Sequence, residues 1–476
     1  MMNRIKAPMA AFAAMVVLSG CNLLDVDNPN SLVEASIRQE AAANGVANGS
    51  LQLVSEAVAD LWEGPEVASD NLQWIGSRDA WGSLDEGAVA DPNNEFLDSA
   101  FPTLGRGVWM AQNAVEILEG HVAENPGVDA FVLDRARAYM FRGLILMVVA
   151  ESQQDMTFSY KMTDGPAVST GNATIGSEEF GATPVASMDA VMDLAITSLA
   201  RAKTDFEALA EDDLALDATA LLARAEMSEE IMSARNSAGG ALAFADALPY
   251  ANEVLTAAGA AADYKFNLNY SSASSGCDLC GNISDRKENQ FDLSLVTVDA
   301  SENVDGIALM DPITGTDDLA LIDALAQFRG GSHLDAGTSF VPLTVASARL
   351  MNLIVAEHEL ATNGGGAGSG FEAAINALRD IDDSDAGYDF ASDGVAANDV
   401  AILQHHRRVN TLLQGLRLQD MYRWGLTPTD AGSGPANRWQ PGSTAVTAPG
   451  TMLPITIIEC RANNFLDGNT CANTGG

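Results

Sequence analysis

A charged side chain stands on the apolar face of a predicted helix near the C-terminus. In the helix expected over 399–424, an apolar stripe from Val409 to Leu416 follows helical spacing. At about 3.6 residues per turn, Asp420 continues that stripe. A carboxylate on a buried face needs a partner, and Arg417 and Arg423 stand about one turn to either side.

Two other predicted helices show the same feature. Arg142 falls within the apolar arc around Phe141, and Glu357 falls near the face of Ile354. One interpretation is a catalytic acid pair; the other, which we favour, is a network that fixes helix register, because buried ion pairs most often serve geometry. We therefore predict structural ion pairs among Arg142, Glu357, Arg417, Asp420 and Arg423.

Two tryptophans in a polar segment offer the chemistry of sugar binding. The apolar face of a sugar ring packs on an indole, while its hydroxyls bond to carboxylates, amides and guanidinium groups. Trp74 and Trp81 have Asp70, Asn71 and Arg78 beside them. We predict that these five side chains contribute to a ligand platform; the alternative is that both rings plug the loop onto the scaffold.

The N-terminal residues predict export and a lipid anchor. A basic start and an apolar run from Met9 to Leu18 precede Ser19-Gly20-Cys21, which is typical of a secretory signal. Because the cut falls before a cysteine, the pattern resembles a bacterial lipobox. It predicts removal of residues 1–20, a thioether-linked lipid on Cys21, and one domain over 21–476 that is anchored rather than embedded. The alternative is an ordinary signal with a chance cysteine.

Four cysteines remain, and an even number in an exported chain suggests two disulfides. The spacing favours the pairs Cys277–Cys280 and Cys460–Cys471. Zinc is disfavoured because the second pair has too long a spacer. A redox pair usually opens a helix after a strand, whereas the segment around Cys277 is predicted as a loop. His405-His406 is disfavoured as a metal site, since neighbours on a helix point about 100° apart. We expect no metal and no cofactor.

Composition excludes some functions. The 476 residues are 47% hydrophobic, enough for a large core. Asp and Glu number 65 against 25 Lys and Arg, a formal net charge of −40. Such a charge repels a phosphate backbone, which argues against nucleic-acid binding, and it disfavours peripheral docking on anionic lipid.

The elements that must position these residues are predicted to be mainly helical. The Ser31–Glu34 capping box opens a helix that breaks near Asn44-Gly45, and a second helix continues to about Trp62. Further helices are predicted at 103–119, 129–151, 187–209, 217–232, 241–258, 342–362, 370–381 and 399–424, with Pro342 at a first helical position. Short loops between neighbours predict antiparallel hairpins. Long polar insertions lie at 63–101, 154–186, 259–339 and 426–476, with strand-like fragments only at 291–298 and 453–458.

Residues 402–425 read ILQHHRRVNTLLQGLRLQDMYRWG. This segment resembles the C-terminal signature of the SusD/RagB-like nutrient-binding outer-membrane lipoproteins. The matching residues are Arg407, Gly415, Arg417, Asp420, Arg423, Trp424 and Gly425. His406, Asn410 and Gln414 stand where the family has glutamates, so the local polar network must be wired differently. Other segments agree in order, namely 112–114, 141–142, 218–225, 356–357, 375–379 and 453–455.

The resemblance implies a scaffold of tetratricopeptide-like hairpins with long irregular excursions. It implies a lipoprotein at the outer face of an outer membrane that captures a nutrient, usually a glycan and sometimes a peptide, without catalysis. It also implies a partner, a SusC-type TonB-dependent transporter barrel over which the lipoprotein sits as a lid.

Two alternatives stay open. One is a surface glycan hydrolase, which needs two carboxylates about 5–10 Å apart; the 65 acidic residues neither show nor exclude such a pair. The other is a helical-repeat assembly scaffold with no small ligand and no barrel partner.

Overall fold

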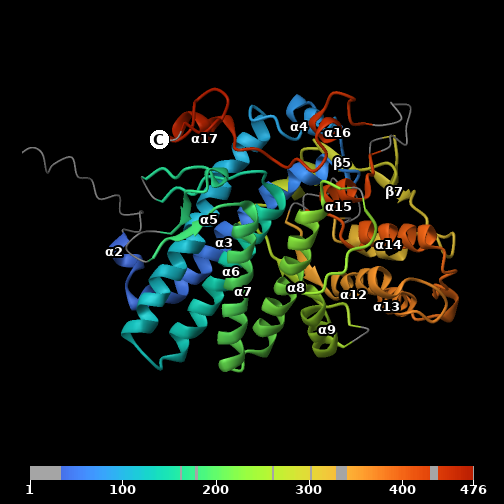
Figure 1. The fold of residues 1–476 in the computed structure, drawn as a ribbon, viewed down its shortest axis with the longest axis horizontal. Helices are drawn as coiled ribbons and strands as arrows, with labels where there is room; N and C mark the ends of the chain where they lie inside the picture. The colour runs from blue at the N-terminus through green and yellow to red at the C-terminus, as the bar shows by residue number, and fades with distance from the viewer. Residues whose placement is uncertain are drawn as a thin grey trace, which may run out of the picture.

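The first part of the fold is a row of long helices (Figure 1). This computed structural model describes residues 34–160, 163–176, 181–237, 239–259, 262–300, 303–328, 340–428 and 438–474. The row consists of α3 (Ala43–Val67), α5 (Glu95–Glu124), α6 (Asp129–Ser152), α7 (Met188–Ala208), α8 (Asp212–Ala234) and α9 (Ala247–Ala258). From α5 onward each helix packs on the next, and α3 packs on α5 and α6. Short loops join α5 to α6 and α7 to α8, so these pairs are antiparallel hairpins.

Polar caps define where the long helices begin. The side chain of Asn94 accepts hydrogen bonds from the backbone N–H groups of Phe96 and Leu97 at the start of α5. Ser187 does the same for Ala190 at the start of α7. Such caps satisfy donors that have no partner within the helix, and each contributes about 1 kcal/mol.

A second group of helices continues the row beyond α9. It consists of α12 (Ala348–Asn363), α13 (Gly370–Arg379), α14 (Ala396–Asn410) and α15 (Arg417–Trp424), which lie together at one end of the molecule (Figure 1). α12 packs against α9, α13 and α14. Leu353, Phe371, Leu403 and Trp424 share a buried apolar cluster there. This group therefore has a small core of its own, next to the large core of the row.

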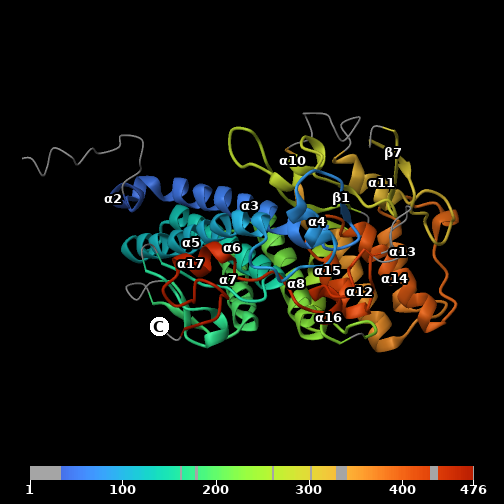
Figure 2. The same ribbon diagram turned by 90° about the horizontal axis from the view of Figure 1, so that it is seen from above.

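Short elements occupy the connections. The short helices are α2 (Glu34–Ile37), η2 (Glu40–Ala42), α4 (Asp79–Asp85), η3 (Val168–Thr170), α10 (Asp278–Ser284), α11 (Leu319–Ala326), η6 (Ala386–Tyr388), α16 (Thr444–Thr447) and α17 (Ile457–Ala462). The described strands form two-stranded antiparallel sheets: β1 (Leu72–Trp74) with β5 (Asn289–Phe291), β2 (Ala173–Ile175) with β3 (Thr183–Val185), β4 (Lys265–Leu268) with β8 (Leu343–Ser347), and β6 (Val296–Val298) with β7 (Val304–Ile307). In both views α17 lies beside α5, although their sequence positions are far apart (Figures 1 and 2).

The predicted mainly helical scaffold is confirmed, and several boundaries differ from the prediction. α3 runs without a break through Asn44-Gly45. Pro342 does not begin a helix; it precedes β8, and α12 starts at Ala348 with Ser347 as its cap. Residues 453–458 form no strand, because only Leu453 makes a bridge and α17 begins at Ile457.

The predicted helix over 399–424 is two helices. α14 ends at Asn410 and α15 begins at Arg417. Between them Leu413 and Gly415 have positive φ angles of 57° and 74°, a conformation that no α-helix contains. The apolar stripe that led to Asp420 therefore crosses a turn.

The N-terminal predictions fall on residues that the structure does not describe. Cys21, the predicted signal over residues 1–20, and Ser31 all lie outside the described ranges. Among the helices of the described ranges, none has both the length and the apolar character that crossing a bilayer requires.

Candidate functional site

The predicted aromatic platform is for the most part folded inward. Trp81 is only 3% exposed, and its ring stacks on Phe96 with 4.0 Å between the centroids. Trp74 packs against Gly82, where an added Cβ would lie 2.9 Å from the indole. Trp81 therefore anchors the loop on the scaffold, contrary to the platform prediction. Trp74 is half-buried and Arg78 is exposed, and a ligand role for them stays a prediction.

Asp70 and Asn71 also serve the fold. Arg417 donates to Asp70 through Nε at 2.6 Å and Nη2 at 2.9 Å, and the Asn71 amide donates to Glu66 at 2.7 Å. Burial acts to raise the pKa of Asp70, but Arg417 and Arg408 outweigh it and hold that pKa well below its usual value. Both side chains are thus bound within the protein and do not present free groups to a ligand.

Four charged side chains meet in the interior between α12, α14 and α15. Arg423 donates to Asp420 Oδ1 from Nε at 2.7 Å and to Glu357 Oε2 from Nη2 at 3.0 Å. Arg407 Nε donates to Asp420 Oδ2 at 2.8 Å. Burial acts to raise the pKa of Asp420, and the two arginines lower it further than burial raises it. The structure thus joins Asp420, Glu357 and Arg423, as the ion-pair prediction has it, and adds Arg407.

This network cannot be a catalytic acid pair. All four side chains are at most 1% exposed, so no substrate reaches the carboxylates. Arg417, predicted as a partner of Asp420, instead pairs with Asp70. The network therefore serves geometry, and it fixes the positions of three helices that meet at the C-terminal signature.

Arg142 is buried, and no acidic side chain in the described ranges forms an ion pair with it. Its Nε donates to the Ser198 hydroxyl at 3.0 Å, and its Nη1 donates to the Gln112 side-chain oxygen Oε1 at 3.1 Å. Its guanidinium also lies 4.8 Å from the centroid of the Tyr139 ring. Burial lowers the pKa of Arg142. Its hydrogen-bond partners in the described part of the chain are neutral, so the ion-pair prediction was wrong for this residue.

The cysteines pair locally. The structure contains the disulfides Cys277–Cys280 and Cys460–Cys471, which the spacing favours. The expected loop is wrong, because Cys277 is the N-cap of α10 and its sulfur accepts from the Cys280 N–H. Cys277 and Cys280 are both buried, and disulfide exchange needs an accessible sulfur. The position therefore favours a structural disulfide over a redox pair.

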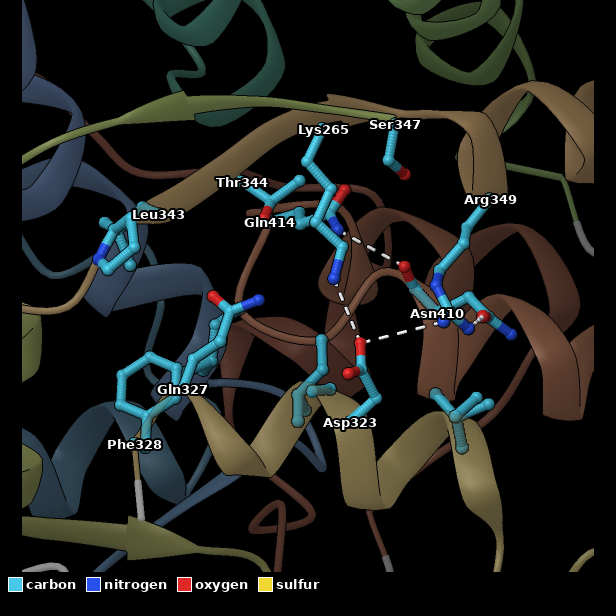
Figure 3. Close-up of a pocket in the computed structure, with 16 residues that line it drawn as sticks. Lys265, Asp323, Gln327, Phe328, Leu343, Thr344, Ser347, Arg349, Asn410 and Gln414 are labelled. Atoms are coloured by element: carbon cyan, nitrogen blue, oxygen red, sulfur yellow. Dashed lines mark hydrogen bonds and ion pairs between the residues drawn. The ribbon is translucent and has the colours of Figure 1, made fainter. Parts of the chain in front are cut away.

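A small polar pocket lies beside β8, between α11 and the turn after α14 (Figure 3). Lys265 bonds to Asp323 at 3.0 Å, and Arg349 lies 3.6 Å from the same carboxylate and donates to Asn410 at 3.1 Å. The pocket has a volume of about 40 Å³, which holds a few water molecules but no sugar ring. The charged side chains that line it pair with one another, so the pocket is a poor ligand site.

One group of side chains has the composition of a metal site. Ligand atoms of Asp311, Asp318 and His405 lie within 4.8 Å of one another. Asp311 is bound by Arg379 at 2.5 Å, and Asp318 is bound by His405 at 2.7 Å. Burial acts to raise the pKa of Asp311, and Arg379 with backbone N–H groups brings it to about 2. Since the arginine supplies the counter-charge, this donor set does not call for an ion.

The best candidate site is a large cavity of about 630 Å³, which we call the aromatic cavity. It lies between the first half of α5, residues 156–160 and 175–176, and α17. Its aromatic lining consists of Phe101, Trp109, Phe158 and Tyr160, and its polar lining of Arg106, Gln112, Thr157, Ser159 and Glu459. A cavity of this size with apolar walls and a few polar groups is typical of small-ligand sites.

Helical spacing on α5 builds one wall of the aromatic cavity. Phe101, Gly105, Val108 and Gln112 recur at intervals of three and four residues and so share one face, and Trp109 is four residues from Gly105 on the same side. Trp109 is not among the predicted ligand-binding residues, because that prediction covers a polar loop and Trp109 falls in the helix predicted over 103–119. The sequence feature that could have indicated the cavity is Gly105, since a glycine between Phe101 and Trp109 leaves room on an otherwise apolar helix face.

Hydrogen bonds fix the polar walls of the aromatic cavity. Tyr160 donates to Glu116 at 3.0 Å, and the Gln112 amide donates to the other oxygen of Glu116 at 3.0 Å. Thr157 donates to Glu459 at 2.7 Å. Side chains held in this way are preorganised, which lowers the entropic cost of binding a ligand.

No protein-family model matches the sequence, and neither does any curated protein. Solved structures do match in fold. A SusD superfamily protein from Bacteroides fragilis shares 13% identity at a TM-score of 0.57, covering 90% of this chain and 98% of its own. The chain has the SusD fold. A SusD homolog from Bacteroides thetaiotaomicron VPI-5482 has 12% identity and a TM-score of 0.57, covering 83% and 88%. A SusD-like carbohydrate binding protein from Bacteroides fragilis NCTC 9343 has 15% identity and a TM-score of 0.52, covering 82% and 86%.

Within this SusD fold, the contacts of His406, Asn410 and Gln414 can now be described; these are the three positions where the resemblance expects glutamates. Asn410 accepts from Arg349 at 3.1 Å, and the Gln414 amide donates to the Asn410 carbonyl at 3.2 Å. Burial, with His405 and Arg379 alongside, lowers the pKa of His406 to about 3, so this imidazole is neutral. Neutral side chains thus stand at positions 406, 410 and 414, and the negative charge that Arg407 and Arg423 meet comes from Glu357 and Asp420.

Proposed function

We propose that the protein is a lipid-anchored carbohydrate-binding protein of an outer-membrane surface, which captures an oligosaccharide and delivers it to a TonB-dependent transporter. The observation that carries the proposal is the aromatic cavity, because its size and lining suit a short stretch of sugar rings. The fold is shared with proteins described as SusD-like carbohydrate binding proteins, which supports the same ligand class.

Binding in the aromatic cavity uses two kinds of contact. The partly exposed rings of Trp109 and Tyr160 pack on the apolar faces of sugar rings, and the polar groups at Arg106, Ser159 and Glu459 bond to hydroxyls. The burial of each ring face contributes to affinity in proportion to the apolar area removed from water. Trp109 has the largest ring in this lining, so we expect it to contribute most.

Replacing Trp109 with alanine is expected to weaken oligosaccharide binding about fivefold or more, because the loss of an aromatic contact costs about 1–3 kcal/mol and 1.4 kcal/mol corresponds to about tenfold. Isothermal titration calorimetry against a panel of oligosaccharides measures the effect. Trp109→Phe retains part of the ring contact and should bind with intermediate affinity. Circular dichroism checks that each variant is folded.

Trp74→Ala is the matched control and decides between the two candidate sites. Trp74 lies in β1, outside the aromatic cavity, so its removal is expected to leave affinity within about twofold. A large loss of oligosaccharide affinity in Trp74→Ala, with full affinity in Trp109→Ala, would place the ligand on the loop that carries Trp74 and Trp81. That outcome would contradict binding in the aromatic cavity.

Replacing Cys21 with serine is expected to move the protein from the membrane fraction to the soluble fraction. Acyl chains stabilise membrane association by about 0.8 kcal/mol per buried CH₂ group, and the variant has no acceptor for them. Mass spectrometry of the native protein should show residues 1–20 removed and an acylated Cys21. Surface proteolysis of intact cells then tests whether the anchored domain faces outward. A native protein that retains its first residues without lipid would contradict the anchor.

The transporter partner and the absence of catalysis have separate tests. A tagged, membrane-extracted form should co-purify a large outer-membrane barrel, whereas an assembly scaffold would not. Incubation with bound oligosaccharides should release no new reducing ends, whereas a surface glycan hydrolase would release them. Binding without cleavage and with a barrel partner is the outcome that the proposal requires.

A further inference from the structure

Glu459 brings a negative charge to the wall of the aromatic cavity. Its Oε1 accepts from Thr157 Oγ1 and from the Asn463 amide, both at 2.7 Å. Across the described ranges, no basic side chain lies within ion-pair distance of this carboxylate, and its Oε2 has no hydrogen-bond donor. The carboxylate is held in position, but its charge is not neutralised by the described residues.

The aromatic rings that line the same cavity as Glu459 favour a cation. The face of an aromatic ring carries negative potential and attracts ammonium groups, most strongly for tryptophan. Phe101, Trp109, Phe158 and Tyr160 line the same cavity. A cavity lined by a carboxylate and by aromatic rings has the chemistry to bind an amine carried on an apolar framework.

Neither Arg106 nor Arg142 forms an ion pair with Glu459. Among the described residues that line the aromatic cavity, Arg106 is the basic one, and it donates to Thr103 at 3.2 Å. Arg142 donates to Gln112 and is not among the described lining residues. Glu116, which accepts from Gln112, partly compensates the positive charge of Arg142. Neither arginine neutralises Glu459.

The charge of the whole chain acts in the same direction. A formal net charge of −40 attracts cationic ligands and repels acidic ones, and it speeds the encounter with the former. This field alone selects no particular site. Combined with Glu459 and the aromatic walls, it favours one ligand class over the neutral and acidic sugars.

We propose that the aromatic cavity selects oligosaccharides that carry free amino groups, with a sugar ring packed on Trp109 and an ammonium group paired with Glu459. The inference rests on the proposed carbohydrate-binding function and specifies its ligand. An N-acetylated sugar of the same length lacks the positive charge, and an acidic sugar meets repulsion from Glu459.

Three oligosaccharides of equal length test the proposal on the mature protein: a glucosamine trimer, an N-acetylglucosamine trimer and a glucose trimer. Calorimetry at near-neutral pH is expected to show the glucosamine trimer binding about tenfold or more tightly than the other two, as charge-assisted hydrogen bonds are roughly twice as strong as neutral ones. Its advantage should shrink as salt rises toward about 0.5 M, because salt screens partly exposed charges.

Glu459→Gln keeps the size of the side chain and removes its charge, so it is expected to abolish the preference for the amino sugar. Glu124→Gln makes the same change in net charge at an exposed position at the far end of α5 and should retain the preference. The comparison separates the local pairing from the field of the whole chain.

The outcomes distinguish the inference from the function on which it rests. Equal affinity for all three trimers, unchanged in Glu459→Gln, would overturn the amino-sugar preference and leave the carbohydrate-binding function standing. Binding of no oligosaccharide by the wild-type protein would overturn both. A preference for the glucosamine trimer that Glu459→Gln removes and Glu124→Gln retains would support both.

Discussion

Asp420→Ala is expected to lower the free energy of unfolding by about 3–5 kcal/mol, the range found when one partner of a buried ion pair is removed. Arg407 and Arg423 both donate to Asp420, and each of these side chains is at most 1% exposed. In the variant both guanidinium groups would share the single carboxylate of Glu357, which lies 3.8 Å from Arg407. Water cannot replace the lost partner without opening the core.

Denaturant unfolding of the purified protein measures the effect of Asp420→Ala, and its yield after export reports the same effect in cells. Asp380→Ala is the control, because Asp380 is an exposed aspartate at the end of α13 and its loss should change stability by less than about 0.5 kcal/mol. A stable and normally exported Asp420→Ala protein would contradict the role assigned to the network.

The same network predicts a pH dependence with a definite sign. The pKa of Asp420 is lower in the folded protein than its ordinary value of 3.8. A lowered carboxyl pKa stabilises the folded state at pH values above the unfolded pKa, and the contribution is lost as the pH falls through the folded pKa. The stability difference between wild type and Asp420→Ala is therefore expected to be constant near neutral pH and to shrink below about pH 4.

The burial of Asp420 could be predicted from sequence, but its partners could not. Helical spacing placed Asp420 on an apolar stripe, and the side chain is indeed buried even though a turn interrupts the helix. Arg417, one turn away in sequence, reaches Asp70 instead. Arg417 and Asp70 are 347 positions apart in the sequence. Their pairing depends on how α15 packs on the loop after α3, which local sequence patterns do not predict.

The aromatic cavity could not be predicted from the sequence for a related reason. Its walls come from α5, the segment after α6 and α17, which meet only in the folded chain. Trp109, which falls in the helix predicted over 103–119, lines the cavity, whereas Trp81, placed at a surface by its polar neighbours, is buried on Phe96. The size of an indole favours burial wherever packing allows it, so polarity of the neighbouring residues is a weak guide to exposure.

Gly415→Ala is expected to destabilise the protein by about 2–5 kcal/mol, the sum of two separate effects. Gly415 has a φ of 74°, and a non-glycine residue pays about 1–2 kcal/mol in that conformation. An added Cβ would lie 2.5 Å from Cδ1 of Trp62, and such overpacking costs about 1–3 kcal/mol. Trp62 is fully buried, with the Arg224 guanidinium 5.1 Å from its ring, so the indole has little room to move.

Gly171→Ala separates the two effects in the same experiment. Gly171 also has a φ of 74°, but nothing lies within 4 Å of the added Cβ, so it should show only the backbone cost of about 1–2 kcal/mol. The difference between the two variants in thermal or denaturant unfolding then measures the contact with Trp62. Because the Gly415 N–H also donates to Glu66 at 2.7 Å, a displaced turn would disturb the end of α3 as well. Equal losses in the two variants would mean that the turn shifts freely and that α15 is not fixed by its close approach to α3.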